Sequence, residues 1–260
     1  MRRRTLLFFS LTLCVILSSC TAAETPAGAY DRYAQAYDRL LQEDSFATES
    51  HEEDYSFFTF SGEEIRTTAD TVSQVIKTDG EYQSISAMVR EDIVDDGPAR
   101  QCIGTAYIRG GWQYSEVIAD GAEAERTRQS CGDDFAFRIA IEGTLMFPAK
   151  VVARQSEQST AEGVLLSFEL DPEKFFAFRF PEIEAATVFT GYRQAPLYSV
   201  LLDADGRLRR VTFGSCLIGE DGTSLMEREC RIEFSRYGEV ELDFPELNDE
   251  DYLDLSRPAE

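Results

Sequence analysis

The spacing of hydrophobic positions changes near residue 54. Before this point, tyrosine and leucine side chains recur every three or four residues, which predicts a helix over 30–42. Beyond it, segments rich in Thr, Val, Ile and aromatic residues predict strands at 55–60, 65–78, 81–94, 100–108, 112–118, 150–155, 163–170, 198–204, 207–217, 228–235 and 239–244. Short helices are expected at 133–141 and at 171–178, where Asp171 precedes a proline as an N-cap residue would.

Segment 81–94 shows the clearest two-residue alternation. Ile85, Ala87 and Val89 fall on one face of this strand, and polar side chains such as Ser86 fall on the other. A half-buried strand normally turns its apolar face to the core, so these three residues are expected to point inward. Thr78-Asp79-Gly80 would join the strand to its predecessor through a hairpin turn, since Asp-Gly accepts positive φ.

The first twenty residues form a secretory signal pattern. Three arginines precede a thirteen-residue apolar stretch, which is shorter than the about 20 residues that a membrane-spanning helix needs. Leu17-Ser18-Ser19-Cys20 resembles a lipobox, which implies removal of 1–19, acylation of Cys20 and anchoring at the outer face of the cell membrane. Ordinary cleavage after Ala23 is the alternative. With Cys20 as the anchor, residues 20–29 would form a short tether to the folded domain.

The composition describes an acidic globular protein. Removal of 1–19 takes away three arginines and leaves 22 basic and 48 acidic residues. Such a chain should not bind nucleic acid, which requires clustered Lys and Arg. The mature chain is long enough for one large domain or two small ones with a buried core. A single domain is expected over 30–247, and 248–260 is expected to be a solvated acidic tail.

Four cysteines remain after the signal and Cys20 are set aside. An even number in an exported protein suggests two disulfides, with three pairings available. Cys216 and Cys230 flank a turn-rich loop and could face one another across a hairpin. Cys102 and Cys131 pair by elimination, provided that residues 119–131, a loose polar stretch, loop back. A metal site is not expected, because no C-x-x-C and no nearby histidine accompany these residues.

Established catalytic motifs are absent from the sequence. There is no G-x-S-x-G, Walker loop, G-x-G-x-x-G or H-E-x-x-H. The single histidine, His51, stands among acids in an expected loop, and Asp203-Ala204-Asp205-Gly206 fits a hairpin turn better than a calcium loop. A carboxylate pair acting as acid and base remains an alternative. No enzyme activity, cofactor or metal is therefore expected.

The order of elements resembles a known family. The features that carry the likeness are a helix after a lipobox, a run of long antiparallel strands, the Gly-Gly-Trp-Gln-Tyr turn at 110–114, and the closing segments 201–208, 232–240 and Phe244-Pro245. Over 30–247 the chain resembles bacterial surface lipoproteins with a LolA-like or LppX/LprG-like half-barrel fold. The resemblance implies a mainly β, α+β fold in which a curved antiparallel sheet wraps around a few helices. It also implies an apolar cavity, which in some members holds lipid or acyl chains, and no catalytic residues.

A half-barrel gives candidate residues for the cavity lining. These are the apolar or amphipathic strand positions Phe58, Phe60, Ile85, Ala87, Val89, Trp112 and Tyr114. The alternative is that the same residues pack against helices in a filled core. Three functions remain open: a lipid-anchored protein that binds an acyl chain or lipid, a cell-envelope module that binds another protein, and a hydrolase with paired carboxylates.

Overall fold

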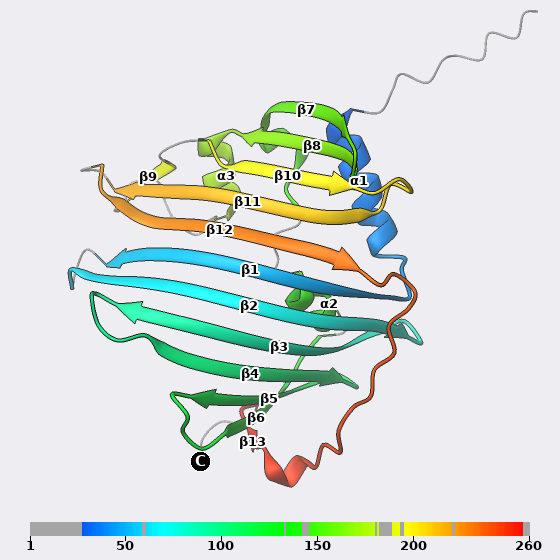
Figure 1. Cartoon of the computed structure of the whole chain (residues 1–260), viewed down its shortest axis with the longest axis vertical. Coiled ribbons are helices and arrows are strands. Elements are labelled where there is room, and N and C mark those ends of the chain that lie inside the picture. Colours follow the sequence, from blue (N-terminus) through cyan, green and yellow to red (C-terminus); the bar gives the residue numbers. More distant parts are fainter. Residues whose placement is uncertain are drawn as a thin grey trace, which may run out of the picture.

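The structure is a computed structural model that describes residues 28–58, 61–132, 134–141, 146–179, 181, 189–192, 195–219 and 222–256. These residues form three α-helices and a thirteen-stranded sheet (Figure 1). The helices are α1 (Ala29–Leu40), α2 (Phe135–Ala140) and α3 (Pro172–Arg179). The strands are β1 (Ser45–Phe58), β2 (Glu63–Thr78), β3 (Glu81–Val94), β4 (Arg100–Arg109), β5 (Trp112–Ala119), β6 (Glu125–Ser130), β7 (Val152–Thr160), β8 (Gly163–Leu170), β9 (Phe189–Tyr192), β10 (Leu197–Leu202), β11 (Leu208–Gly219), β12 (Ser224–Ser235) and β13 (Leu253–Asp254).

The strands form one curved, open sheet. Their order is β13-β6-β5-β4-β3-β2-β1-β12-β11-β10-β8-β7, and β9 pairs separately with β11. All pairs are antiparallel except β13 with β6. The pairing of β1 with β12 joins the meander β1–β6 to the later strands. The expected mainly β, α+β half-barrel is confirmed.

The three helices lie on one side of the sheet, here called the inner face (Figure 1). Ring contacts place each helix there: Tyr33 of α1 meets Phe168, and Phe175 of α3 meets Phe213. Phe137 of α2 contacts Phe46 in the same way. The continuous apolar core therefore lies mainly beneath β1, β12, β11, β10 and β8.

Two of the expected helices follow from local sequence signals. The helical stripe predicted over 30–42 forms α1, in which Tyr33 and Leu40 are buried. In α3 the carboxylate of Asp171 accepts a hydrogen bond from the backbone N–H of Lys174 at 3.0 Å. Asp171 is thus the N-cap residue that the sequence indicated. Among the described residues, no helix is long and apolar enough to cross a membrane.

Three segments differ from the sequence-based expectation. β1 begins at Ser45, so the acidic stretch around His51 is strand and not loop. The loose polar stretch contains β6, and segment 239–244 forms no strand. β1 is paired along both edges, and this pairing outweighs the weak strand propensity of its acidic residues.

Residues 249–256, here called the C-terminal strap, pack against β5 and β6. Arg128 of β6 forms ion pairs with Asp249 and with Asp254, the latter at 3.2 Å, and lies over the ring of Trp112. The hydroxyl of Tyr252 donates to Glu116 at 2.8 Å. The described part of the expected acidic tail is therefore held against the sheet by charge pairs and a short parallel strand, and is not a solvated tail.

The expected disulfide between Cys216 and Cys230 is not formed. In the β11–β12 hairpin, Cys216 lies opposite Glu227, and Cys230 lies opposite Phe213. Three positions on β11 separate these pairs, which places the two sulfur atoms on opposite faces of the sheet. A hairpin loop brings its flanking strands together, but the register decides which residues face one another.

The expected disulfide between Cys102 and Cys131 is also absent. Cys102 lies opposite Ala119, near the start of β4, whereas the backbone N–H of Cys131 donates to Gly111 O at the other end of that strand. At about 3.4 Å per residue, the intervening strand separates them by on the order of 20 Å, well beyond the reach of a disulfide.

Candidate functional site

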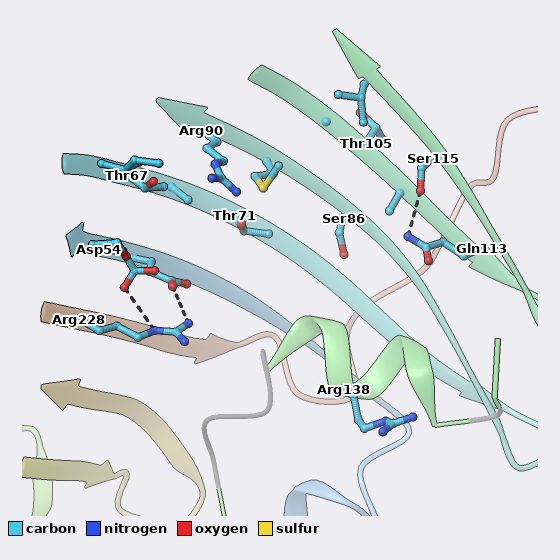
Figure 2. Close-up of a pocket in the computed structure, with 18 of the residues that line it drawn as sticks. Asp54, Thr67, Thr71, Ser86, Arg90, Thr105, Gln113, Ser115, Arg138 and Arg228 are labelled. Atoms are coloured by element: carbon cyan, nitrogen blue, oxygen red, sulfur yellow. Dashed lines mark hydrogen bonds and ion pairs between the residues drawn. The ribbon is translucent and has the colours of Figure 1, made fainter. Parts of the chain in front are cut away.

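A pocket of about 980 Å³ lies on the inner face of β1–β5. The adjoining half of this face is covered by the apolar core. Over the pocket, α2 is the helix that the described part of the chain places above the strands, and it contributes Phe135 and Arg138 to the wall (Arg138 is labelled in Figure 2). Arg228 of β12 closes the side next to β1. The volume falls within the roughly 300–1,000 Å³ typical of small-molecule sites.

Small side chains make the floor of the pocket. Gly104 lines it beside Met88, and a Cβ on Gly104 would lie 3.4 Å from Met88 Cε. Ala69 and Ala106 also line the floor, and Phe58 and Ile65 contribute larger apolar surface. More of the lining surface is apolar than polar, although most of the lining residues carry hydroxyl, amide or charged groups, and the small residues leave the space open.

The structure places one of the expected lining residues at the pocket. Phe58 lines it, while Phe60 lies outside the described residues. The prediction of which face of β3 and β5 points inward is wrong. Ser86 and Met88 of β3 and Gln113 and Ser115 of β5 face the pocket. The opposite, outer face therefore carries the remaining five candidates: Ile85, Ala87, Val89, Trp112 and Tyr114.

The close approach of α2 explains this reversal. Ser73 and Ser86 are buried beneath it with their hydroxyl oxygens 2.8 Å apart, and Thr48 donates to Ala140 O at 2.9 Å. Small hydroxyl residues admit the helix close to the sheet and satisfy their own hydrogen bonds. The alternation of apolar and polar residues along β3 does not indicate that α2 covers the polar face of this strand.

A charged cluster stands at one side of the pocket, where β12 and β1 meet (Figure 2). Arg228 Nη2 lies 2.5 Å from Glu52 Oε1, and Arg228 Nε lies 3.7 Å from Asp54 Oδ1. Across β2, Arg90 Nε lies 3.0 Å from Asp92 Oδ1. Glu52 and Asp54 are two positions apart on β1, so both carboxyl groups project to the inner face.

Asp54 has an altered protonation equilibrium. Burial, followed by a hydrogen bond to Glu52 and the negative charge of Glu52, raises the pKa of Asp54 from 3.8 to about 7, against the opposing effect of Arg228 and Arg90. Two carboxyl groups that share a proton in this way titrate as a pair. Glycosidase carboxylates are about 5–9 Å apart, a separation that a hydrogen-bonded pair does not have.

This cluster is not evident from the sequence. Glu52 and Asp54 fall in the acidic segment around His51 that is expected to be a loop, and in a loop a two-residue spacing carries no information about a shared face. Recognition of β1 as a strand would have placed both on one side of it. Their contact with Arg228, more than 170 positions further along the chain, follows only from the pairing of β1 with β12.

The other features singled out in the sequence lie elsewhere. His51 is on the outer face, with Nδ1 2.7 Å from Asp70, and the hydrogen bonds to Asp70 and Glu53 raise its pKa. Asp203 closes a hairpin turn by accepting from the backbone N–H groups of Asp205 and Arg207. The described residues contain no group of side chains suited to a metal ion. The signal and Cys20 lie outside the described residues.

Comparison with known proteins yields distant structural likenesses only. No protein-family model and no curated protein matches this chain. Among solved structures, a beta-barrel-like protein of the domain of unknown function DUF1849 from Brucella abortus is similar at 9% identity and a TM-score of 0.30, over 74% of this chain and 98% of that chain. A DUF1329 family protein from Desulfovibrio piger is similar at 15% identity and a TM-score of 0.26, over 83% of this chain and 93% of that chain. At these TM-scores neither likeness is informative about function.

Proposed function

We propose that this protein is a non-enzymatic, lipid-anchored surface protein that holds an apolar ligand, such as an acyl chain or lipid, in the inner-face pocket. The pocket itself carries the proposal. Its floor carries small side chains, its lining exposes more apolar than polar surface, and hydroxyl, amide and charged side chains supply polar groups around it. Apolar surface combined with polar groups that can fix a ligand's orientation is typical of ligand sites.

The N-terminal pattern supports the location part of the proposal. A lipid on Cys20 and a short tether would keep the domain near the outer leaflet of the cell membrane, from which an apolar ligand could enter the pocket. The net charge of −23 for the full chain disfavours attraction to an anionic bilayer surface, so the anchor would provide the attachment.

Native mass spectrometry of the purified protein tests ligand binding. We expect the wild-type protein to carry a co-purified lipid mass. Ala69→Trp, which fills the pocket floor, should reduce the bound fraction about tenfold or more. Ala87→Trp is the matched control, since Ala87 is exposed on the outer face of the neighbouring strand. A wild-type protein without lipid, or equal retention by both variants, would contradict the proposal.

A protein-binding role in the cell envelope is the second candidate. It is favoured by an exposed apolar row on the outer face, where Val89 pairs with Ile103 and Ile103 pairs with Ile118. Their exposed fractions are 43%, 46% and 38%. Contiguous apolar surface of this kind often marks an interaction site. This role predicts no co-purified lipid in the same mass spectra.

A further inference from the structure

Arg90 presents a free hydrogen-bonding edge to the pocket. Its Nε atom donates to both carboxylate oxygens of Asp92, at 3.0 Å and 3.1 Å. Its terminal Nη1 and Nη2 atoms have no hydrogen-bond or ion-pair partner among the described residues. The side chain is 45% exposed, and Figure 2 shows it projecting from β3 on the pocket side of the strands. These two nitrogens form the fork that binds a carboxylate or a phosphate through parallel hydrogen bonds.

The neighbouring strand fixes the orientation of this guanidinium group. The hydroxyl of Thr67 on β2 donates to Asp92 Oδ1 at 2.6 Å, and the Asp92 side chain is only 28% exposed. Asp92 therefore holds the Nε edge of Arg90 and leaves the fork of Nη1 and Nη2 free. A donor that is already oriented loses less conformational entropy when a ligand binds.

The other two arginines that line the pocket are less suited to receive an anion. Arg228 is paired with Glu52, and its Nε atom is buried. Arg138 is paired through Nε with Asp134 on the same turn of chain, and these two side chains are 61% and 63% exposed. Water screens so exposed a pair, which orients its arginine only weakly. Arg90 therefore combines a free fork with a fixed orientation.

The floor of the pocket begins beside Arg90. Ala69 lies opposite Arg90 on β2, and Met88 is the next residue of β3 on the same face. Gly104 lies opposite Met88 on β4, and Ala106 follows Gly104 on the same wall. An alkyl chain whose head is bound at Arg90 can therefore lie along small and apolar side chains.

We propose that the pocket selects amphiphiles with an oxyanion head, a carboxylate or a phosphate monoester, which the fork of Arg90 receives while the alkyl chain lies over the floor. This inference rests on the proposed function, because it names the ligand class of the same pocket.

The charge of the lining differs from that of the whole chain. The chain has 48 acidic and 25 basic residues, whereas the lining has three arginines and two acids, Glu52 and Asp54. Burial, followed by the hydrogen bond to Glu52 and its charge, raises the pKa of Asp54 to about 7, so Asp54 carries only part of a negative charge at neutral pH. Repulsion from distant acids is screened beyond about 8 Å at physiological ionic strength. Contacts within the lining, and not the net charge of the chain, therefore decide which head is bound.

Displacement of the neutral fluorescent probe N-phenyl-1-naphthylamine measures this selectivity with four twelve-carbon ligands. At pH 7 and 150 mM NaCl, dodecanoate or monododecyl phosphate should bind about tenfold tighter than dodecanol, because a charge-assisted hydrogen bond is stronger than a neutral one. Dodecylamine should bind more weakly than dodecanol. Arg90→Gln should abolish the ratio of anion to alcohol affinity and leave the affinity for dodecanol unchanged.

Arg138→Gln is the matched control, because it removes the same charge from the lining of the same pocket. This variant should retain the wild-type ratio, which separates the fork of Arg90 from the charge of the pocket. Urea unfolding confirms that both variants fold. If Arg90→Gln does not fold, Arg90→Lys replaces it, since a lysine keeps the positive charge beside Asp92 but lacks the fork and should lower the ratio.

The outcomes separate the head preference from the proposed function. Equal binding of the anions and the alcohol, or tightest binding of dodecylamine, would overturn the oxyanion preference and leave the apolar pocket standing. A ratio that is lost in Arg138→Gln and kept in Arg90→Gln would overturn the role of Arg90. Failure of all four ligands to displace the probe would overturn the proposed function itself.

Discussion

At the scale of single residues, the protonation of Asp54 depends on three segments of the chain. β1 places Asp54 next to Glu52, β12 brings Arg228 to one side, and β3 contributes Arg90 across the pocket. Burial and the neighbouring acid outweigh the two cations, so the proton is retained to about pH 7. A carboxyl group with this pKa titrates near neutral pH, well above the range in which unperturbed Asp and Glu side chains titrate.

The raised pKa of Asp54 gives stability a specific pH dependence. The folded protein binds the proton more tightly than the unfolded chain, so this contribution is fully present below pH 3.8 and is lost as pH rises through about 7. Asp54→Asn keeps a neutral side chain at every pH. Relative to wild type, the variant's free energy of unfolding should therefore rise by about 1 kcal/mol from pH 5 to pH 8, after solvent screening.

Urea unfolding at the two pH values measures this difference. Glu49→Gln, the exposed carboxylate variant of the same strand, should show no comparable trend. A difference between Asp54→Asn and wild type that stays constant with pH would mean that Asp54 is ionised at pH 5 in the folded protein.

At the scale of elements, the C-terminal strap covers the edge of the sheet at β6. An edge strand exposes unpaired backbone groups, and here β13 pairs with part of them. The side chains of Tyr252 and Tyr114 stack edge to face, and Arg128 is enclosed between the strap and Trp112. The strap thus packs against β5 and β6 and is a part of the folded domain.

Trp112, the single tryptophan of the chain, reports on the strap directly. Replacement of Asp249 and Asp254 by alanine removes both ion pairs to Arg128, so the strap should detach. We expect a red shift of tryptophan emission and stronger acrylamide quenching, with little change in the unfolding midpoint. The double replacement of Glu250 and Asp251 by alanine is the control with equal charge change, since both side chains are exposed. Identical spectra for the two variants would refute the role of the ion pairs.

Individual elements differ in how far their sequences predict them. α1 and the N-cap of α3 follow from local spacing and capping, which depend on residues within one turn of each other. β1 does not, because its stability comes from two neighbouring strands and its acids favour solvent. The candidate site is not evident from the sequence for the same reason. Glu52 and Asp54 share a face only when this segment is a strand, and local sequence signals predict a loop.

At the scale of the whole molecule, the core is unevenly distributed beneath the sheet. Tyr33, Phe168 and Val200 are fully buried in the half that contains β8, β10 and β11. The inner face of β3–β5 borders the pocket and has fewer buried apolar partners. One continuous sheet therefore has a well-packed half and a half that borders the open pocket.

Hydrogen exchange should reveal this asymmetry. Amides of β8, β10 and β11 should exchange most slowly, while those of β4 and β5 exchange at least tenfold faster, because local opening there exposes less apolar surface. Addition of a pocket ligand should slow exchange in β3–β5 selectively. Uniform protection across the sheet in the unliganded protein would contradict the uneven core.

The sequence alone determined the helix of residues 30–42, most of the strands and the overall class, because these depend on periodicity and on short-range turn and capping chemistry. Alternation divides each strand into two faces, but it does not say which face is covered. That choice came from α2, which packs on the serine face of β3 and leaves Val89 exposed. The cysteine register, the position of the strap and the contact of Asp54 with Arg228 were likewise decided by the tertiary structure, because each joins residues whose proximity depends on how distant strands pair.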